Sequence, residues 1–69
     1  MSAEIHLLDD VALLEDLPDR GLRRGQVGTI AEVLGPSEFE VEFADSDGRT
    51  YASAALRKEQ LLLLLYDPA

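Results

Sequence analysis

Three glutamates are the residues whose type and spacing best suit chemistry. They are Glu38, Glu40 and Glu42, which alternate with Phe39, Val41 and Phe43. Successive side chains of a β-strand point to opposite faces, so this alternation predicts a strand with one apolar and one acidic face. Neighbouring carboxylates can act as acid and base only in a pocket that separates their pKa values, and a small β-domain rarely leaves such a cleft. We therefore predict that the chain is not an enzyme and that the glutamates bind a basic surface; the alternative is a solvent face on which charge prevents aggregation.

A basic loop is the second candidate. Its arginines are Arg20, Arg23 and Arg24, half of the six basic residues in the chain, and they precede the glycine-containing segment Gly25–Ile30. Glycines among basic residues are typical of β-barrels that contact RNA, which makes this segment an alternative nucleic-acid loop. In the competing interpretation the glycines serve a bend and the arginines pair with Asp16 and Asp19. The formal net charge of −8 opposes nucleic acid as the partner.

This chain has few residues that could bind a metal or a cofactor or act as a nucleophile. There is no cysteine and a single histidine, His6, so neither a thiolate nor a histidine-cluster metal site is expected. The segment Asp45–Gly48 resembles the start of a calcium loop but lacks the later ligands, and it predicts a hairpin turn. Ser53 has no histidine placed to activate it. We expect no catalytic residue, no metal and no cofactor.

A run of five leucines near the C-terminus, Leu61–Leu65, is followed by Tyr66. In a strand only alternate residues face the core, so Leu62, Leu64 and Tyr66 would face away from it. An exposed apolar strand marks a contact surface, and we therefore predict a partner-binding role for these three residues. The alternative is a strand covered on both sides by the long loop or the N-terminal segment. Because leucine is also a good helix former, the run could instead continue a short helix.

Turn signals about every ten residues indicate an all-β fold. The expected strands are 10–14, 27–34, 38–44, 50–55 and 61–65, with a helical or 3-10 turn at 56–60 before the last strand. Leu17 and Leu22 would anchor the long loop 15–26, and Gly28 would mark a bulge or a close backbone approach. These elements predict one domain over residues 1–69, with its core at about 7–65, folded as a small five-stranded SH3-like barrel. No signal peptide or membrane-spanning run is evident, so we expect a cytoplasmic protein without a membrane partner.

Several phrases resemble a family of short bacterial SH3-like proteins known as domain of unknown function 4926. They are Asp-x-Val-Ala-Leu (9–13), Leu-Pro-x-x-Gly-Leu (17–22), Arg-Gly-x-Val-Gly-Thr-Ile (24–30), Glu-Val-Glu-Phe (40–43) and Asp-Gly-Arg-Thr (47–50). The resemblance implies a barrel encoded beside another small open reading frame, an arrangement similar to toxin–antitoxin or immunity pairs. It carries over no functional residue. We therefore expect an antitoxin-like or immunity-like protein whose partner is a basic protein such as a toxin, or a second copy of the chain.

Overall fold

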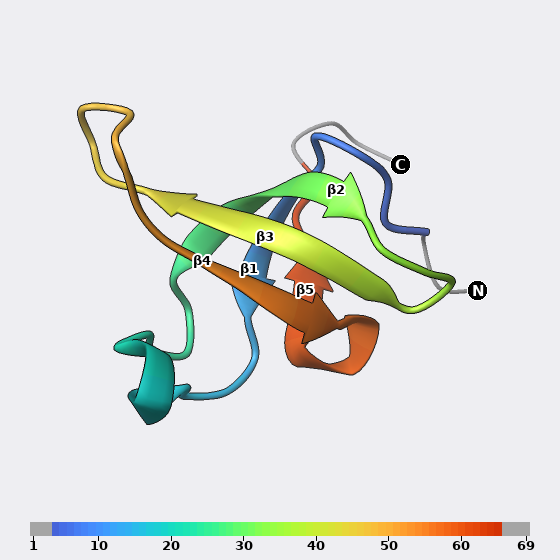
Figure 1. Ribbon diagram of the computed structural model, residues 1–69, viewed down its shortest axis with the longest axis horizontal. Helices are drawn as coiled ribbons and strands as arrows, with labels where there is room; N and C mark the ends of the chain where they lie inside the picture. The colour runs from blue at the N-terminus through green and yellow to red at the C-terminus, as the bar shows by residue number, and fades with distance from the viewer. Residues whose placement is uncertain (1–3, 66–69) are drawn as a thin grey trace.

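Five antiparallel strands form one sheet in the computed structural model, which describes residues 4–65 (Figure 1). The elements are β1 (Asp10–Leu13), η1 (Pro18–Arg20), β2 (Val27–Val33), β3 (Glu38–Ala44), β4 (Thr50–Arg57), η2 (Lys58–Gln60) and β5 (Leu61–Leu63), where η denotes a 3-10 turn. The prediction of an all-β chain with five strands and a 3-10 turn before the last is confirmed. The predicted bounds of β3 match the structure, whereas β4 extends further, to Arg57, and β5 ends earlier, at Leu63. No helix in residues 4–65 is long and apolar enough to cross a membrane.

The sheet curls but does not close. Its strand order is β4-β3-β2-β1-β5, so β4 and β5 are edge strands, and the closed barrel predicted from the sequence is not formed. The last strand, β5, has only three residues. Near this seam the backbone amide of Lys58 in η2 donates to the carbonyl of Ser37 at 2.9 Å. This bond extends the β3–β4 ladder by one pair beyond Glu38 and Arg57, so η2 begins where that ladder ends.

The core lies on the inner face of the curled sheet. The buried apolar residues that pack together are Val11, Leu13, Leu22, Ile30, Phe39, Val41, Phe43, Ala54, Leu56 and Leu61. On β3 burial alternates strictly, because Phe39, Val41 and Phe43 face inward. The alternation seen in the sequence therefore does supply one wall of the core.

Gly28 allows the sheet to fold tightly over this core. In the strand register it lies between Val11 of β1 and Phe43 of β3. A Cβ atom placed on Gly28 would lie 2.7 Å from Cγ1 of Val41 and 2.9 Å from the carbonyl oxygen of Glu42. The predicted close approach is confirmed, whereas the irregularity in the β2–β3 pairing lies further along β2, between Ile30 and Glu32.

The long loop between β1 and β2 is anchored as predicted. Leu22 is buried in the core, Leu17 is half-buried against it, and the two form an isolated β-bridge. Between them lies η1, which ends at Gly21 with a φ of 67°. The predicted hairpin turn is also present, because one carboxylate oxygen of Asp45 accepts the amides of Asp47 and Arg49. The loop and the turn thus have fixed positions from which their side chains project.

Candidate functional site

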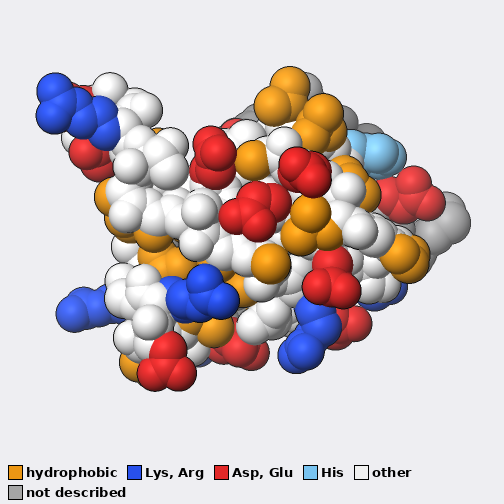
Figure 2. Space-filling view, in the orientation of Figure 1, with side chains coloured by type: hydrophobic (Ala, Val, Ile, Leu, Met, Phe, Trp, Pro, Cys, Tyr) orange, Lys and Arg blue, Asp and Glu red, His pale blue; other side chains and the backbone are white. Residues whose placement is uncertain are grey.

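The acidic face is the outer surface of the β2–β3–β4 part of the sheet, and we define it by Glu32, Glu38, Glu40 and Glu42. Glu40 lies directly opposite Glu32 of β2, and Glu42 lies between Thr29 of β2 and Ser53 of β4. Figure 2 shows acidic side chains gathered over the centre of the face that β2, β3 and β4 form. The paired strands hold the carboxylates in place, because the opposite side of β3 is packed in the core.

The carboxylates of the acidic face form no ion pair in the part of the chain that the structure describes. Within residues 4–65, none of the four glutamates has a basic side chain within ion-pair distance. Arg57 lies opposite Glu38 in the register, but its Nε is 3.8 Å from a carboxylate oxygen of Glu59 instead. Like charges directly opposite each other on a sheet lower its stability. The acidic face therefore lowers the stability of the fold, and its carboxylates are available to bind lysine or arginine side chains.

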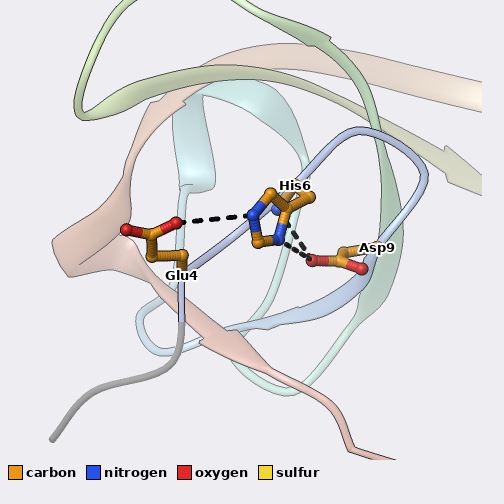
Figure 3. Close-up of polar contacts among 3 residues, drawn as sticks. All are labelled: Glu4, His6 and Asp9. Atoms are coloured by element: carbon orange, nitrogen blue, oxygen red, sulfur yellow. Dashed lines mark hydrogen bonds and ion pairs between the residues drawn. The ribbon is translucent and has the colours of Figure 1, made fainter.

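His6 belongs to the N-terminal segment and lies between two carboxylates (Figure 3). Its Nε2 is 3.4 Å from Glu4 and its Nδ1 is 3.8 Å from Asp9. The backbone amide of His6 also donates to the Asp9 carboxylate at 2.7 Å, which closes the turn that leads into β1. Ser53 lies on β4 opposite Glu42, and its register partner is not a histidine. No group of three or more His, Asp or Glu side chains in the described part of the chain is arranged to hold a metal.

The basic end is the second surface, which we define by Arg20, Arg23, Arg24 and Arg49. Because Gly28 pairs with Phe43 and Phe43 with Ala52, the long loop and the β3–β4 turn lie at the same end of the sheet, on the left in Figure 1. None of these four arginines forms an ion pair with any residue from 4 to 65. The expected pairing with Asp16 and Asp19 is therefore absent from this range. The Asp16 carboxylate instead accepts the backbone amide of Arg24 at 2.8 Å, because the loop needs a partner for that amide.

Tyr51 adds an aromatic ring at this end that sequence reasoning missed. The β3–β4 pairing shifts between Phe43 and Ala44, which leaves Tyr51 as the extra residue of a bulge. Its ring is 49 % exposed, and its hydroxyl accepts a hydrogen bond from Nε2 of Gln26 at 3.0 Å. Only the pairing of the two strands reveals the bulge, so no local sequence pattern could have identified this residue.

The leucine-rich edge is the third surface, and only part of the prediction falls on it. Leu62 is 51 % exposed, whereas Leu64 is half-buried and donates its backbone amide to the carbonyl of Asp10. Tyr66 lies outside the described residues. The predicted glutamates and leucines do not lie on adjacent strands, because β2 and β1 separate β3 from β5 in the sheet.

An apolar groove of about 730 Å³ runs beside β5. Its lining residues are Glu4, Ile5, Val33, Gly35, Pro36, Phe39, Lys58, Glu59, Leu61, Leu62, Leu63 and Leu65. They come from the N-terminal segment, the end of β2, the β2–β3 turn, η2 and β5. Of the predicted site residues that the structure describes, Leu62 alone lines the groove. The remaining lining residues were not predicted, because the groove forms only where segments that are distant in the sequence meet.

Comparison with known proteins places the chain in a family. The family described as "Domain of unknown function (DUF4926)" matches residues 7–63. No curated protein and no solved structure is similar enough to the chain to match it. The matched residues include the whole acidic face, all four arginines of the basic end and all of β5. Since the match covers most of its length, the chain belongs to the DUF4926 family of domains of unknown function.

Proposed function

We propose that this chain is a non-enzymatic protein-binding module whose acidic face holds a basic surface of a partner protein. The observation that carries the proposal is the set of four glutamates on two paired strands, none of which forms an ion pair within residues 4–65. Folding alone does not favour this arrangement, because Glu32 and Glu40 repel each other across the strands. The arrangement does favour capture of a cationic partner, since complementary charge accelerates encounter and fixes orientation.

The partner is the product of a neighbouring gene, and binding masks that product in the cytoplasm, as an antitoxin or an immunity protein masks its target. This part of the proposal rests on the resemblance described above and on the net charge of −8, which suits a basic target. Co-expression of the two genes should yield a complex that survives purification. Absence of any association, together with no relief of toxicity, would contradict it.

The acidic face is tested by neutralising two of its carboxylates. The double variant Glu40→Gln and Glu42→Gln should weaken the complex by about tenfold or more, equivalent to about 1.4 kcal/mol, as measured by isothermal titration calorimetry. The matched control is Asp19→Asn with Asp47→Asn, which changes the net charge equally in the long loop and the β3–β4 turn. Equal weakening by both double variants would show that only net charge matters.

A stability measurement separates lost binding from lost folding. Because Glu40 faces Glu32, Glu40→Gln should leave the domain as stable as before or more stable by a few tenths of a kcal/mol in urea unfolding. A variant that binds less tightly yet unfolds no more easily would identify a surface kept for binding. A loss of stability would instead show that Glu40 stabilises the folded domain.

A second candidate function, binding of single-stranded RNA at the basic end, is favoured by one observation. The four arginines there have no ion-pair partner within residues 4–65, and the exposed ring of Tyr51 lies at the same end of the sheet. Guanidinium groups and an aromatic ring are what single strands require for phosphate contact and base stacking. The net charge of −8 opposes this function, so we place it second.

The RNA candidate is tested by salt dependence. If Arg23 and Arg24 each contact one phosphate, replacing both with alanine should reduce the slope of log affinity against log salt by about 1.4 for a single-stranded oligonucleotide. Fluorescence anisotropy at several salt concentrations measures this slope. The control is Arg57→Ala with Lys58→Ala, which removes the same charge beside η2. Equal slopes for both double variants would show that the basic end is not where the oligonucleotide binds.

A further inference from the structure

The outer edge of β5, on the side away from β1, has no paired strand in the described part of the chain. Within residues 4–65 β5 pairs only with β1, and it stands last in the strand order. The amide of Leu14 donates to Gln60, and the amide of Leu64 donates to Asp10. In an antiparallel pair backbone groups alternate in direction, so residues 60, 62 and 64 face β1. The backbone amide and carbonyl of Leu63 therefore face away from β1, at the open seam of the sheet.

The apolar groove lies along this same seam. Its walls combine residues of β5 with Val33, Pro36 and Phe39 from the far side of the opening, and Ile5 contributes from the N-terminal segment. Val33 and Leu62 are each about half exposed, so apolar surface is left uncovered there. An unpaired strand edge with an apolar groove beside it is an arrangement that can bind an extended peptide by strand addition.

The charges on the groove favour a cationic occupant over a second copy of this chain. Among the described residues Glu4, Glu59 and Lys58 line it, and Glu59 also lies 3.8 Å from Nε of Arg57, so Glu4 is the lining carboxylate without a lysine or arginine partner in residues 4–65. A second copy would bring a further net charge of −8 and its own Glu4 and Glu59. A segment of a basic protein would bring lysine or arginine side chains to the same carboxylates.

We infer that the groove binds one extended segment of the partner protein, which adds to β5 as a further strand. Alternate apolar side chains of the segment enter the groove, and lysine or arginine side chains between them reach Glu4 and compete with Arg57 for Glu59. The inference rests on the proposed function, because it identifies the part of the basic partner that is held. The acidic face and the groove then contact different parts of that partner.

The test uses the full chain and a capped nine-residue peptide of alternating valine and lysine. In a titration followed by NMR, the largest shifts should fall on Val33, Leu62 and Leu63, and the Leu63 amide should become protected from hydrogen exchange. Leu62→Asn should weaken peptide binding about tenfold. The matched control, Leu7→Asn, should leave binding unchanged, because Leu7 is equally exposed but lies outside the groove. Replacing lysine by glutamate in the peptide should abolish binding.

A modified peptide removes any dependence on how the protein variants fold. Methylation of the backbone amides along one edge of the peptide should abolish binding to the unaltered chain, because the strand bonds to Leu63 cannot form. Shifts confined to the acidic face, or full binding by the methylated peptide, would overturn the inference. So would a Leu63 amide already protected in a dimer of the free chain. Failure of the peptide test leaves the proposed function standing, because the acidic face is tested separately by the Glu40 and Glu42 variants with the partner protein.

Discussion

Phe43→Ala is expected to lower the free energy of unfolding by about 3–5 kcal/mol, the usual cost of removing a fully buried phenylalanine ring. Phe43 is completely buried and pairs with Gly28 on one side and Ala52 on the other. Gly28 has no side chain and Ala52 has only a methyl group, so neither can fill the cavity that the ring would leave. A single core in a chain of 69 residues supplies no more than about 3–5 kcal/mol in total. The variant should therefore be largely unfolded at room temperature.

Urea unfolding followed by circular dichroism measures this effect, with Val27→Ala as the control. Val27 belongs to the same end of the sheet but is about half exposed, and its truncation should cost less than about 1 kcal/mol. A folded Phe43→Ala variant with near-normal stability would show that the core does not depend on this ring.

Gly28→Ala should be nearly as damaging, although it adds only one methyl group. The new Cβ would lie 2.9 Å from the carbonyl oxygen of Glu42, which belongs to the backbone of the neighbouring strand. It would also lie 2.7 Å from Cγ1 of Val41 and 3.0 Å from Cδ1 of Phe43, two side chains that are fully buried. Since neither strand nor core can move aside cheaply, we expect a loss of about 2–3 kcal/mol.

Gly35→Ala is the matched control for this substitution. A Cβ on Gly35 meets nothing within 4 Å, and Gly35 is not among the described residues with positive φ. Its replacement should therefore be neutral or slightly stabilising, because alanine restricts the unfolded chain. The same urea experiment compares the two variants. Equal stabilities would mean that β2 and β3 are further apart at Gly28 than the structure places them.

The sequence is most informative where a pattern repeats within one element. The alternation in residues 38–44 predicts both bounds of β3, together with its buried and exposed faces. Gly28 interrupts a run of strand-forming residues, and a glycine in that position commonly marks a place where another backbone comes close. Leu17 and Leu22 stand out as apolar residues in a polar loop, and both pack against the core.

Other features could not be predicted because they depend on pairing between distant segments. A run of identical leucines contains no alternation, so it indicates neither the end of β5 at Leu63 nor which leucines are exposed. The arginines have acidic neighbours in the sequence, yet Asp16 binds a backbone amide instead. Closure of a barrel requires a long enough last strand, and composition does not reveal where that strand ends.

The open sheet also affects how copies of the chain interact with one another in solution. Within residues 4–65 both β4 and β5 have an edge without a paired strand, and edges of this kind can join one copy of a protein to the next. At pH 7 each copy carries a net charge of −8, so approaching copies repel each other before their edges meet. That repulsion fades as the pH falls toward the sequence isoelectric point of about 4.3, and added salt screens it. The excess of carboxylates thus keeps apart molecules whose backbones would otherwise pair.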